Sequence, residues 1–212
     1  MKLHPFKIRP KKYLDSYGKG HEIAITLKSF DFHYLADINQ IAQEILTQDN
    51  RSDYLPFLQT AIKELVQNAI KATQKRIFFQ NHNWDIEHPK EDYVEEFQHY
   101  LHEGKGKNFP QDHVFSAMIY FQKVRNFFYM TVKNRGVMTN LERQNLEHMF
   151  DRGRKMHSVA ELLDNESHQK EGGGLGISMI LVLGKKFYPN DDLLTYISID
   201  EETEFCLKLP ME

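Results

Sequence analysis

Cysteine is almost absent from this sequence of 212 residues, since Cys206 is its only one. One cysteine excludes an internal disulfide, and the alternating apolar stretch around it predicts a buried structural thiol rather than a nucleophile.

Long apolar runs are missing too. The longest, around 180–183, is far too short to cross a bilayer, and the N-terminus lacks the apolar stretch of a signal peptide. We therefore expect a cytoplasmic protein without membrane insertion.

The sequence also lacks a large excess of positive or negative charge. The net charge of -3 gives no general attraction to nucleic acid, so we expect no nucleic-acid partner. The eleven histidines are scattered and lack cysteine or carboxylate partners at metal-site spacing, which argues against a metal held by protein side chains alone. The apolar share of 41% is typical of a globular domain, which we place at 22–212 after an N-terminal extension at 1–21.

Apolar periodicity predicts the elements of this domain. Alternation indicates strands at 22–27, 114–122, 126–132, 194–199 and 204–209. Three- and four-residue spacing indicates helices at 34–46, from 54 past 73, and at 175–186. A polar insertion at about 81–112 contains a short helix at 91–101, and a polar connection at 133–174 contains short helices at 141–150 and 159–163. We expect a two-layer α/β sandwich, with a mixed, mostly antiparallel sheet and three long helices on one face.

Three polar residues of the second helix, Glu64, Asn68 and Lys71, follow one another at four- and three-residue spacing and form one stripe. Their chemistry suits a phosphate group with magnesium. An amide oxygen is a ligand for Mg²⁺, an ammonium group neutralises phosphate oxygens, and a carboxylate orients or deprotonates an attacking group. Alone, the same stripe also fits an ordinary solvated helix face.

A run of glycines, at 172–174 and 176, leads directly into the helix predicted at 175–186. Backbone without side chains lets phosphates approach the positive N-terminus of a helix, although glycines also serve as hinges and helix stops. The stripe and the glycine turn together indicate a nucleotide site.

These segments resemble the sequence boxes of the ATP-binding superfamily that contains the histidine kinases, gyrase and MutL (GHKL). The segment 64–71, Glu-Leu-Val-Gln-Asn-Ala-Ile-Lys, is similar to its asparagine box, and 172–177 is similar to its second glycine box. The segment 150–154, Phe-Asp-Arg-Gly-Arg, resembles the Phe box of histidine-kinase lids, and 205–210 resembles the closing strand. The boxes occur in family order over 22–210, apart from the insertion.

The resemblance implies the Bergerat fold of that superfamily, with ATP and Mg²⁺ as ligands. Asn68 then takes the magnesium position, Lys71 contacts the phosphates and Glu64 acts as the general base. An ATP lid at about 135–174 would bring Arg152 and Arg154 to the γ-phosphate when it closes. The same two residues equally fit a solvated basic turn paired with Glu161 and Asp164. The other residues placed at the nucleotide are Asn134, Gly136, Gly172, Gly174, Leu175, Gly176 and Thr203.

The first glycine box departs from the family pattern. The family has Asp-x-Gly-x-Gly, with the Asp accepting a hydrogen bond from the adenine amino group, whereas this sequence has Asn134-Arg135-Gly136-Val137-Met138. An asparagine oxygen still accepts that bond, but the amide adds donors and removes the charge. Met138 brings a bulky side chain to the position of the second glycine.

Two functions follow from these residues. In the first, an ATP-binding signalling domain, similar to the catalytic domain of sensor histidine kinases, phosphorylates a separate protein or hydrolyses ATP. In the second, a degenerate kinase-like module acts by binding a protein partner and binds nucleotide weakly or not at all, as Asn134, Met138 and the insertion suggest. Autophosphorylation in cis is not expected, because His21-Glu22 runs into a strand rather than into a long helix.

Overall fold

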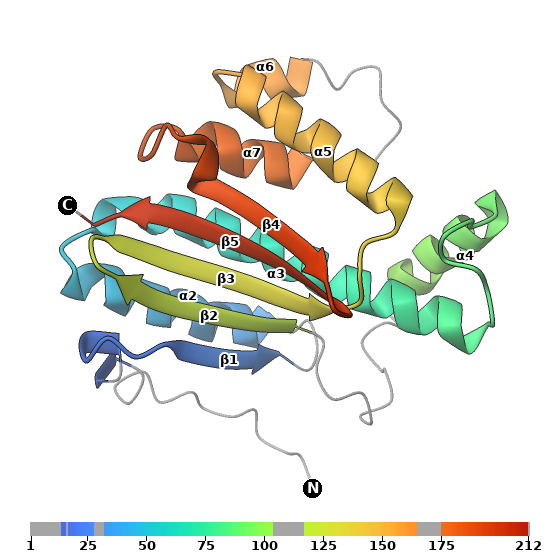
Figure 1. Ribbon diagram of the computed structural model, residues 1–212, viewed down its shortest axis with the longest axis horizontal. Coiled ribbons are helices and arrows are strands. Elements are labelled where there is room, and N and C mark those ends of the chain that lie inside the picture. Colours follow the sequence, from blue (N-terminus) through green and yellow to red (C-terminus); the bar gives the residue numbers. More distant parts are fainter. Residues whose placement is uncertain (1–13, 16, 28–31, 104–116, 165–174, 212) are drawn as a thin grey trace, which may run out of the picture.

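Figure 1 shows the computed structural model, which describes residues 14–15, 17–27, 32–103, 117–164 and 175–211. The strands are β1 (Ile23–Leu27), β2 (Ala117–Val124), β3 (Phe127–Arg135), β4 (Leu194–Ile199) and β5 (Glu202–Pro210). The α-helices are α2 (Phe32–Gln48), α3 (Leu55–Asn81), α4 (Glu91–His102), α5 (Asn140–Lys155), α6 (Val159–Asp164) and α7 (Leu175–Gly184). The predicted elements are present, with ends shifted by a few residues.

The five strands form one sheet in the order β1-β2-β3-β5-β4. All four pairings are antiparallel. The two-layer α/β class is therefore confirmed, while the parallel pairing that a mixed sheet allows does not occur among the described strands. Strands β4 and β5 are joined by Asp200 and Glu201, which both have positive φ, as a type I′ hairpin turn requires. The twist of this turn matches that of the strands and places β4 directly beside β5.

Helices α2, α3 and α7 pack on one face of the sheet (Figure 1). In β5, every second residue from Thr203 to Leu209 is buried on this face, and the residues between them are half-buried on the open face. Helix α3 buries the apolar stripe that its sequence predicted, including Leu58, Ile62 and Leu65. The burial of these apolar side chains is the main favourable contribution to folding.

Cys206 lies in β5 on the open face of the sheet and is half-buried, not fully buried as we predicted. Desolvation by its neighbours raises the pKa of the Cys206 thiol. A raised pKa disfavours the thiolate, which is the nucleophilic form of cysteine.

Helix α3 continues to Asn81, past the end of the sheet, and α4 packs against this extension (Figure 1). The contact is aromatic. Phe78 and Phe79 of α3 and Phe97 of α4 are buried together, and Trp84 and Tyr93 stack with their ring centroids 3.9 Å apart. The described part of the insertion therefore extends the helical layer and does not cover the open face of the sheet.

Helix α5 begins with a capping box, in which Thr139 accepts from the backbone of Glu142 and the Glu142 carboxylate accepts from the backbone of Thr139. The helix runs to Lys155, further than we predicted, and packs against α7. At the contact, Gly153 lies against Leu181 and Ser178, where a Cβ would collide. No helix in the part of the chain that the structure describes is long and apolar enough to cross a membrane.

Candidate functional site

A cavity of about 540 Å³ opens where α3, the end of β3, the start of β5, α5 and the start of α7 meet. The fold brings together in its lining most of the residues that the sequence placed at a nucleotide. These are Glu64, Asn68, Lys71, Asn134, Leu175, Gly176 and Thr203. They come from α3, β3, α7 and β5, so tertiary structure assembles the site from segments that are far apart in the sequence.

Three polar residues on the α3 side of the cavity make no hydrogen bond or ion pair within the described residues. Asn68 and Lys71 are exposed, Glu64 is half-buried, and all three line the cavity. Gly176, in the first turn of α7, lies so close to Glu64 that an added Cβ would collide with its carboxylate. Glycine at this position therefore lets the positive N-terminus of α7 approach that carboxylate.

Asn134 lies on the opposite side of the cavity and is only 2% exposed. Its amide nitrogen donates to the carbonyl oxygen of Arg135 at 2.9 Å, and its side-chain oxygen has no hydrogen-bond partner among the described residues. The amide is thus oriented with an acceptor left for a ligand, the role that the resemblance gives to this position. An aspartate would instead put a carboxylate oxygen next to the Arg135 carbonyl.

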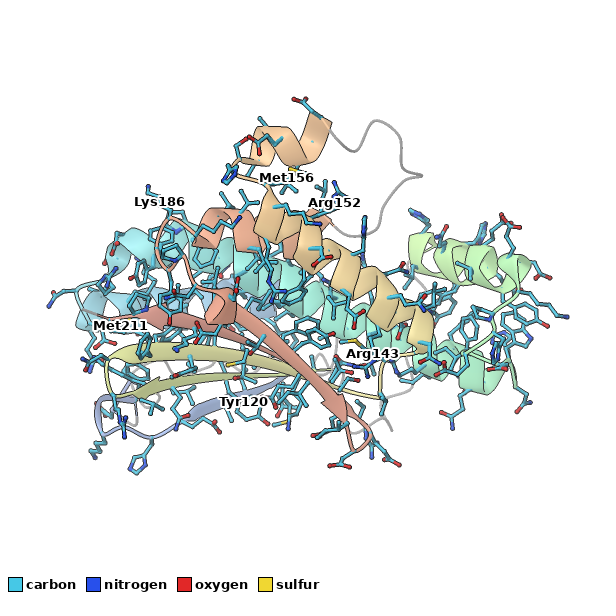
Figure 2. All side chains as sticks on the ribbon, turned by 45° about the horizontal axis from the view of Figure 1, so that its top comes forward. Tyr120, Arg143, Arg152, Met156, Lys186 and Met211 are labelled. Atoms are coloured by element: carbon cyan, nitrogen blue, oxygen red, sulfur yellow. The ribbon has the colours of Figure 1, made fainter. Side chains whose placement is uncertain are left out.

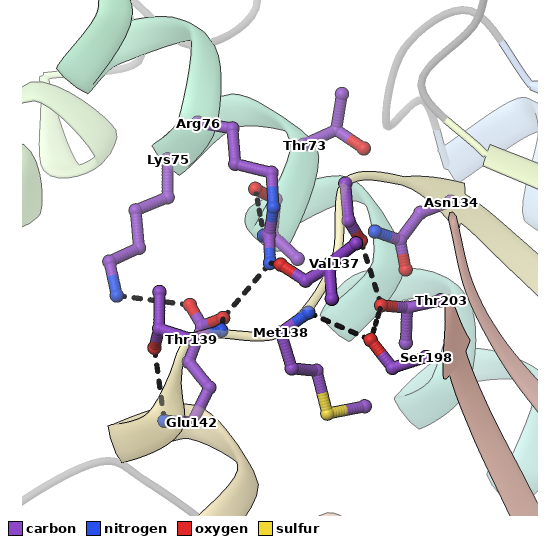
Figure 3. A network of polar contacts seen from close by, with 12 residues as sticks. Thr73, Lys75, Arg76, Asn134, Val137, Met138, Thr139, Glu142, Ser198 and Thr203 are labelled. Atoms are coloured by element: carbon purple, nitrogen blue, oxygen red, sulfur yellow. Dashed lines mark hydrogen bonds and ion pairs between the residues drawn. The ribbon is translucent and has the colours of Figure 1, made fainter. Parts of the chain in front are cut away.

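A chain of hydrogen bonds ties the turn after β3 to the β4–β5 hairpin (Figure 3). The Met138 N–H donates to Ser198 Oγ at 2.8 Å, and the hydroxyl groups of Ser198 and Thr203 are 3.0 Å apart. The Thr203 hydroxyl donates to the carbonyl oxygen of Gly136 at 2.8 Å. The Thr203 proton is therefore used in the hydrogen bond to the backbone. The Thr203 oxygen can still accept a hydrogen bond from a ligand in the cavity.

Gly136 does not line the cavity and has a structural role in this turn. Its φ is +98°, and its N–H donates to the carbonyl oxygen of Glu201 at 2.5 Å. A Cβ at this position would collide with the side chain of Arg76. Both the backbone angle and the close approach require glycine here. The prediction that Gly136 contacts a nucleotide stays a prediction.

Glu142 is the centre of a charged cluster at the cavity that sequence reasoning missed. Its carboxylate is 3.0 Å from Lys75 Nζ and 2.9 Å from Arg76 Nη2, and Arg76 also donates to the carbonyl oxygens of Ala72 and Val137 (Figure 3). Burial alone would raise the pKa of Glu142, but Arg76, Lys75 and the Thr139 N–H hold it below its ordinary value. The Thr-x-x-Glu spacing of a capping box was the signal that could have found this carboxylate.

Two further residues of the lining, Met138 and Phe97, were not predicted as parts of the site. Met138 had been noted only as a bulky departure from the glycine box. Phe97 comes from α4 in the insertion, and no local pattern in the sequence places that helix beside α3.

Arg152 and Arg154 lie outside the cavity lining. Arg152 Nη2 donates to the carbonyl oxygen of Leu162 in α6 at 3.3 Å, and Figure 2 shows Arg152 on α5 close to that helix. Arg154 Nε is 3.8 Å from Asp191, and its guanidinium group lies 5.4 Å from the centre of the Phe150 ring. Their contact with a γ-phosphate stays a prediction. Gly172 and Gly174 lie outside the described residues.

The donor set around the cavity fits a magnesium ion that is held mainly by phosphate oxygens. Within the described ranges, no group of three or more His, Cys, Asp or Glu residues gathers as a metal site. Glu64 and Asn68 each offer an oxygen from the same face of α3. Because Mg²⁺ usually keeps several waters and binds through one or two protein oxygens plus substrate phosphates, this short donor set suits a nucleotide complex.

Comparisons with known proteins establish no family. No protein-family model matches the chain. An uncharacterized protein of Treponema pallidum (strain Nichols) is 25% identical over 190 residues, 84% of this chain and 35% of that protein, so the chain spans about a third of that relative's length. A chain in the crystal structure of the SiaB-SiaC complex from Pseudomonas aeruginosa aligns with a TM-score of 0.47 and 12% identity, over 96% of this chain and 98% of that chain. Structural similarity at this TM-score and sequence identity supports no conclusion about function.

Proposed function

We propose that the cavity binds ATP with Mg²⁺ and that the protein is a signalling enzyme of the GHKL type, which phosphorylates a partner protein or hydrolyses ATP. One observation carries the proposal. Glu64, Asn68 and Lys71 line the same cavity as Asn134 and Gly176, although these residues come from separate elements. An ordinary solvated helix face does not require such convergence.

Each group on the α3 side has a chemical role in this proposal. The Asn68 oxygen would hold the magnesium ion, and the Lys71 ammonium group would neutralise phosphate oxygens. Backbone N–H groups in the first turn of α7 would favour phosphate at the same end of the cavity. Glu64, next to Gly176, would accept the proton of the attacking hydroxyl group or water. Magnesium bound with the nucleotide would offset the charge of the phosphates.

Isothermal titration calorimetry with Mg²⁺ and a non-hydrolysable ATP analogue tests the proposal. We expect the unmodified protein to bind and Asn68→Ala to lose about tenfold or more in Mg²⁺-dependent affinity, a loss of about 1.4 kcal/mol or more. Lys63→Ala is the matched control, because Lys63 is exposed on the same helix and does not line the cavity. Equal binding by the unmodified protein and Asn68→Ala would refute the magnesium role.

The second candidate is a degenerate module that works by binding a protein partner. A specific observation favours it: on the β3 side of the cavity, Asn134, Thr203 and Glu142 already have partners within the protein. In this case Mg²⁺ and ATP leave the thermal unfolding temperature unchanged and calorimetry shows no heat of binding. A partner protein would then bind equally well to the unmodified protein and to Asn68→Ala.

A further inference from the structure

Strand β4 forms one edge of the sheet and pairs only with β5 among the described residues. The two-residue turn that follows β4 makes Ile199 a hydrogen-bonded position of the ladder, so Thr195 and Ile197 also bond to β5. The backbone N–H and C=O groups of Tyr196 and Ser198 therefore point outward. In the described part of the chain these outward groups have no backbone partner.

Within the described residues, this edge lacks features that usually protect an edge strand. Proteins blunt such edges with lysine, proline, bulges or a covering segment. The sequence of β4, Leu-Thr-Tyr-Ile-Ser-Ile, contains neither lysine nor proline. Ile197 and Ile199 are 56% and 61% exposed, which is unusual for large apolar side chains on a strand with open hydrogen-bonding groups. These features leave the β4 edge open to pairing with another strand.

A groove of about 290 Å³ runs beside this edge, between β4 and α5. Tyr196 and Phe150 contact one another in it, with ring centroids 5.4 Å apart. The residues that line the groove are Glu147, Phe150, Asp151 and Arg154 from α5, and Leu194, Thr195 and Tyr196 at β4. A strand added to β4 would place alternate side chains over this groove.

The charges around the groove are mainly negative. Glu147 and Asp151 are both exposed and lie one turn apart on α5, an arrangement of like charges that destabilises a helix unless a cation lies nearby. Arg154, the cation of the lining, is directed to Asp191 and to the Phe150 ring. At the far end of β4, the exposed turn at 200–201 adds two more carboxylates. A strand with basic residues complements this surface.

A second copy of the chain does not complement it. Asp191 and Asp192 are ion-paired with Arg154 and Lys208, but Glu147, Asp151, Asp200 and Glu201 form no ion pair among the described residues. Symmetric antiparallel pairing of β4 with the β4 of another molecule would therefore bring together two surfaces that both carry an excess of negative charge. Like charges in opposed positions destabilise antiparallel pairs. We propose that the β4 edge and the adjoining groove bind an extended, basic segment of a partner protein by strand addition, at a surface separate from the nucleotide cavity.

Synthetic peptides test this inference. The probe is Lys-Lys-Val-Thr-Val-Thr-Val-Lys-Lys, and the comparison peptide carries Glu at the four Lys positions. We expect the basic peptide to bind about tenfold or more tightly than the acidic one, by fluorescence anisotropy, and to slow hydrogen exchange at the Tyr196 and Ser198 amides. Reversing the groove charge with Glu147→Lys and Asp151→Lys should remove this preference.

A matched control variant, Glu95→Lys with Glu96→Lys, makes the same charge change on exposed positions of α4 and should leave peptide binding unchanged. Equal binding of both peptides, or no slowing of exchange at Tyr196 and Ser198, would overturn the inference. Protein self-association that slows exchange at these same amides without any peptide would overturn it too, because a second copy would then occupy the edge. Thermal unfolding of each variant shows whether it is folded.

Discussion

The two sides of the cavity use similar polar residues in opposite ways. On the α3 side, Asn68 and Lys71 are exposed and have no partner among the described residues. On the β3 side, Asn134, Thr203 and Glu142 are hydrogen-bonded or ion-paired within the protein and hold together the turn that leads into α5. The first set is arranged for a ligand, and the second is arranged chiefly for the fold.

This difference teaches that residue type alone does not separate binding residues from structural ones. Buried polar groups require partners, because an unsatisfied group costs about 1–3 kcal/mol. On the β3 side, Thr203, Glu142 and the amide nitrogen of Asn134 meet that requirement internally. The exposed Asn68 and Lys71 on the α3 side are satisfied by water and can exchange water for a ligand. Substitutions on the β3 side should therefore lower stability, whereas substitutions of Asn68 and Lys71 on the α3 side should lower binding alone.

The largest loss of stability is expected for Gly136→Ala. Alanine at the φ of +98° costs about 1–2 kcal/mol, and displacing Arg76 from its carbonyl and carboxylate partners costs about 1–3 kcal/mol more. We expect the free energy of unfolding, measured with urea, to fall by about 3 kcal/mol.

Gly20→Ala is the matched control for this substitution. Gly20 also has a positive φ, at +78°, but no atom of the described residues lies within 4 Å of an added Cβ. It should therefore show the cost of backbone strain alone, about 1 kcal/mol. Equal losses for the two variants would mean that the contact with Arg76 contributes nothing and that the β3 side is less tightly held than we infer.

An intermediate effect is expected for Glu142→Gln. Loss of the ion pairs with Lys75 and Arg76 should lower the free energy of unfolding at neutral pH by about 1–2 kcal/mol. Because the folded-state pKa of Glu142 lies below its ordinary value of 4.5, this stabilisation is fully present above that value and is lost as the pH falls through the lower folded pKa.

Urea unfolding of the unmodified protein and Glu142→Gln at pH 7 and at successively lower pH measures this effect. The difference between the two proteins should shrink as the pH falls below 4.5. Glu95→Gln, an exposed glutamate on α4, should show no such difference at any pH. A gap between Glu142→Gln and the unmodified protein that does not change with pH would mean that packing, and not the carboxylate charge, stabilises this turn.

The sequence predicted correctly that three polar residues of α3 share one face, because the information there is local. Residues at four- and three-residue spacing share a helix face whatever surrounds the helix, so Glu64, Asn68 and Lys71 were identified together. The fold class followed for the same reason. Strand alternation and helix periodicity are local patterns, and the antiparallel sheet with its helical layer is their simplest packing.

The β3 side could not be predicted in the same way, because its structure depends on partners that are distant in the sequence. Glu142 lies in the first turn of α5, while Lys75 and Arg76 lie on α3, and no periodicity relates them. The hydrogen bond from Asn134 to the Arg135 carbonyl depends on the local backbone path after β3. The same limit applied to Phe97, whose place in the cavity lining follows from how α4 packs on α3.

The smallest effect on stability, and the sharpest test of the comparison, is expected for Asn68→Ala without a ligand. Asn68 is exposed within α3 and has no partner among the described residues, and alanine is the better helix former by about 0.5 kcal/mol. The free energy of unfolding should therefore stay the same or rise slightly, while Mg²⁺-dependent nucleotide binding is lost. Retaining asparagine at a position where alanine is more stable is understandable if a ligand needs its oxygen. A fall of more than about 1 kcal/mol would show instead that Asn68 supports the fold, and the two sides of the cavity would no longer differ in kind.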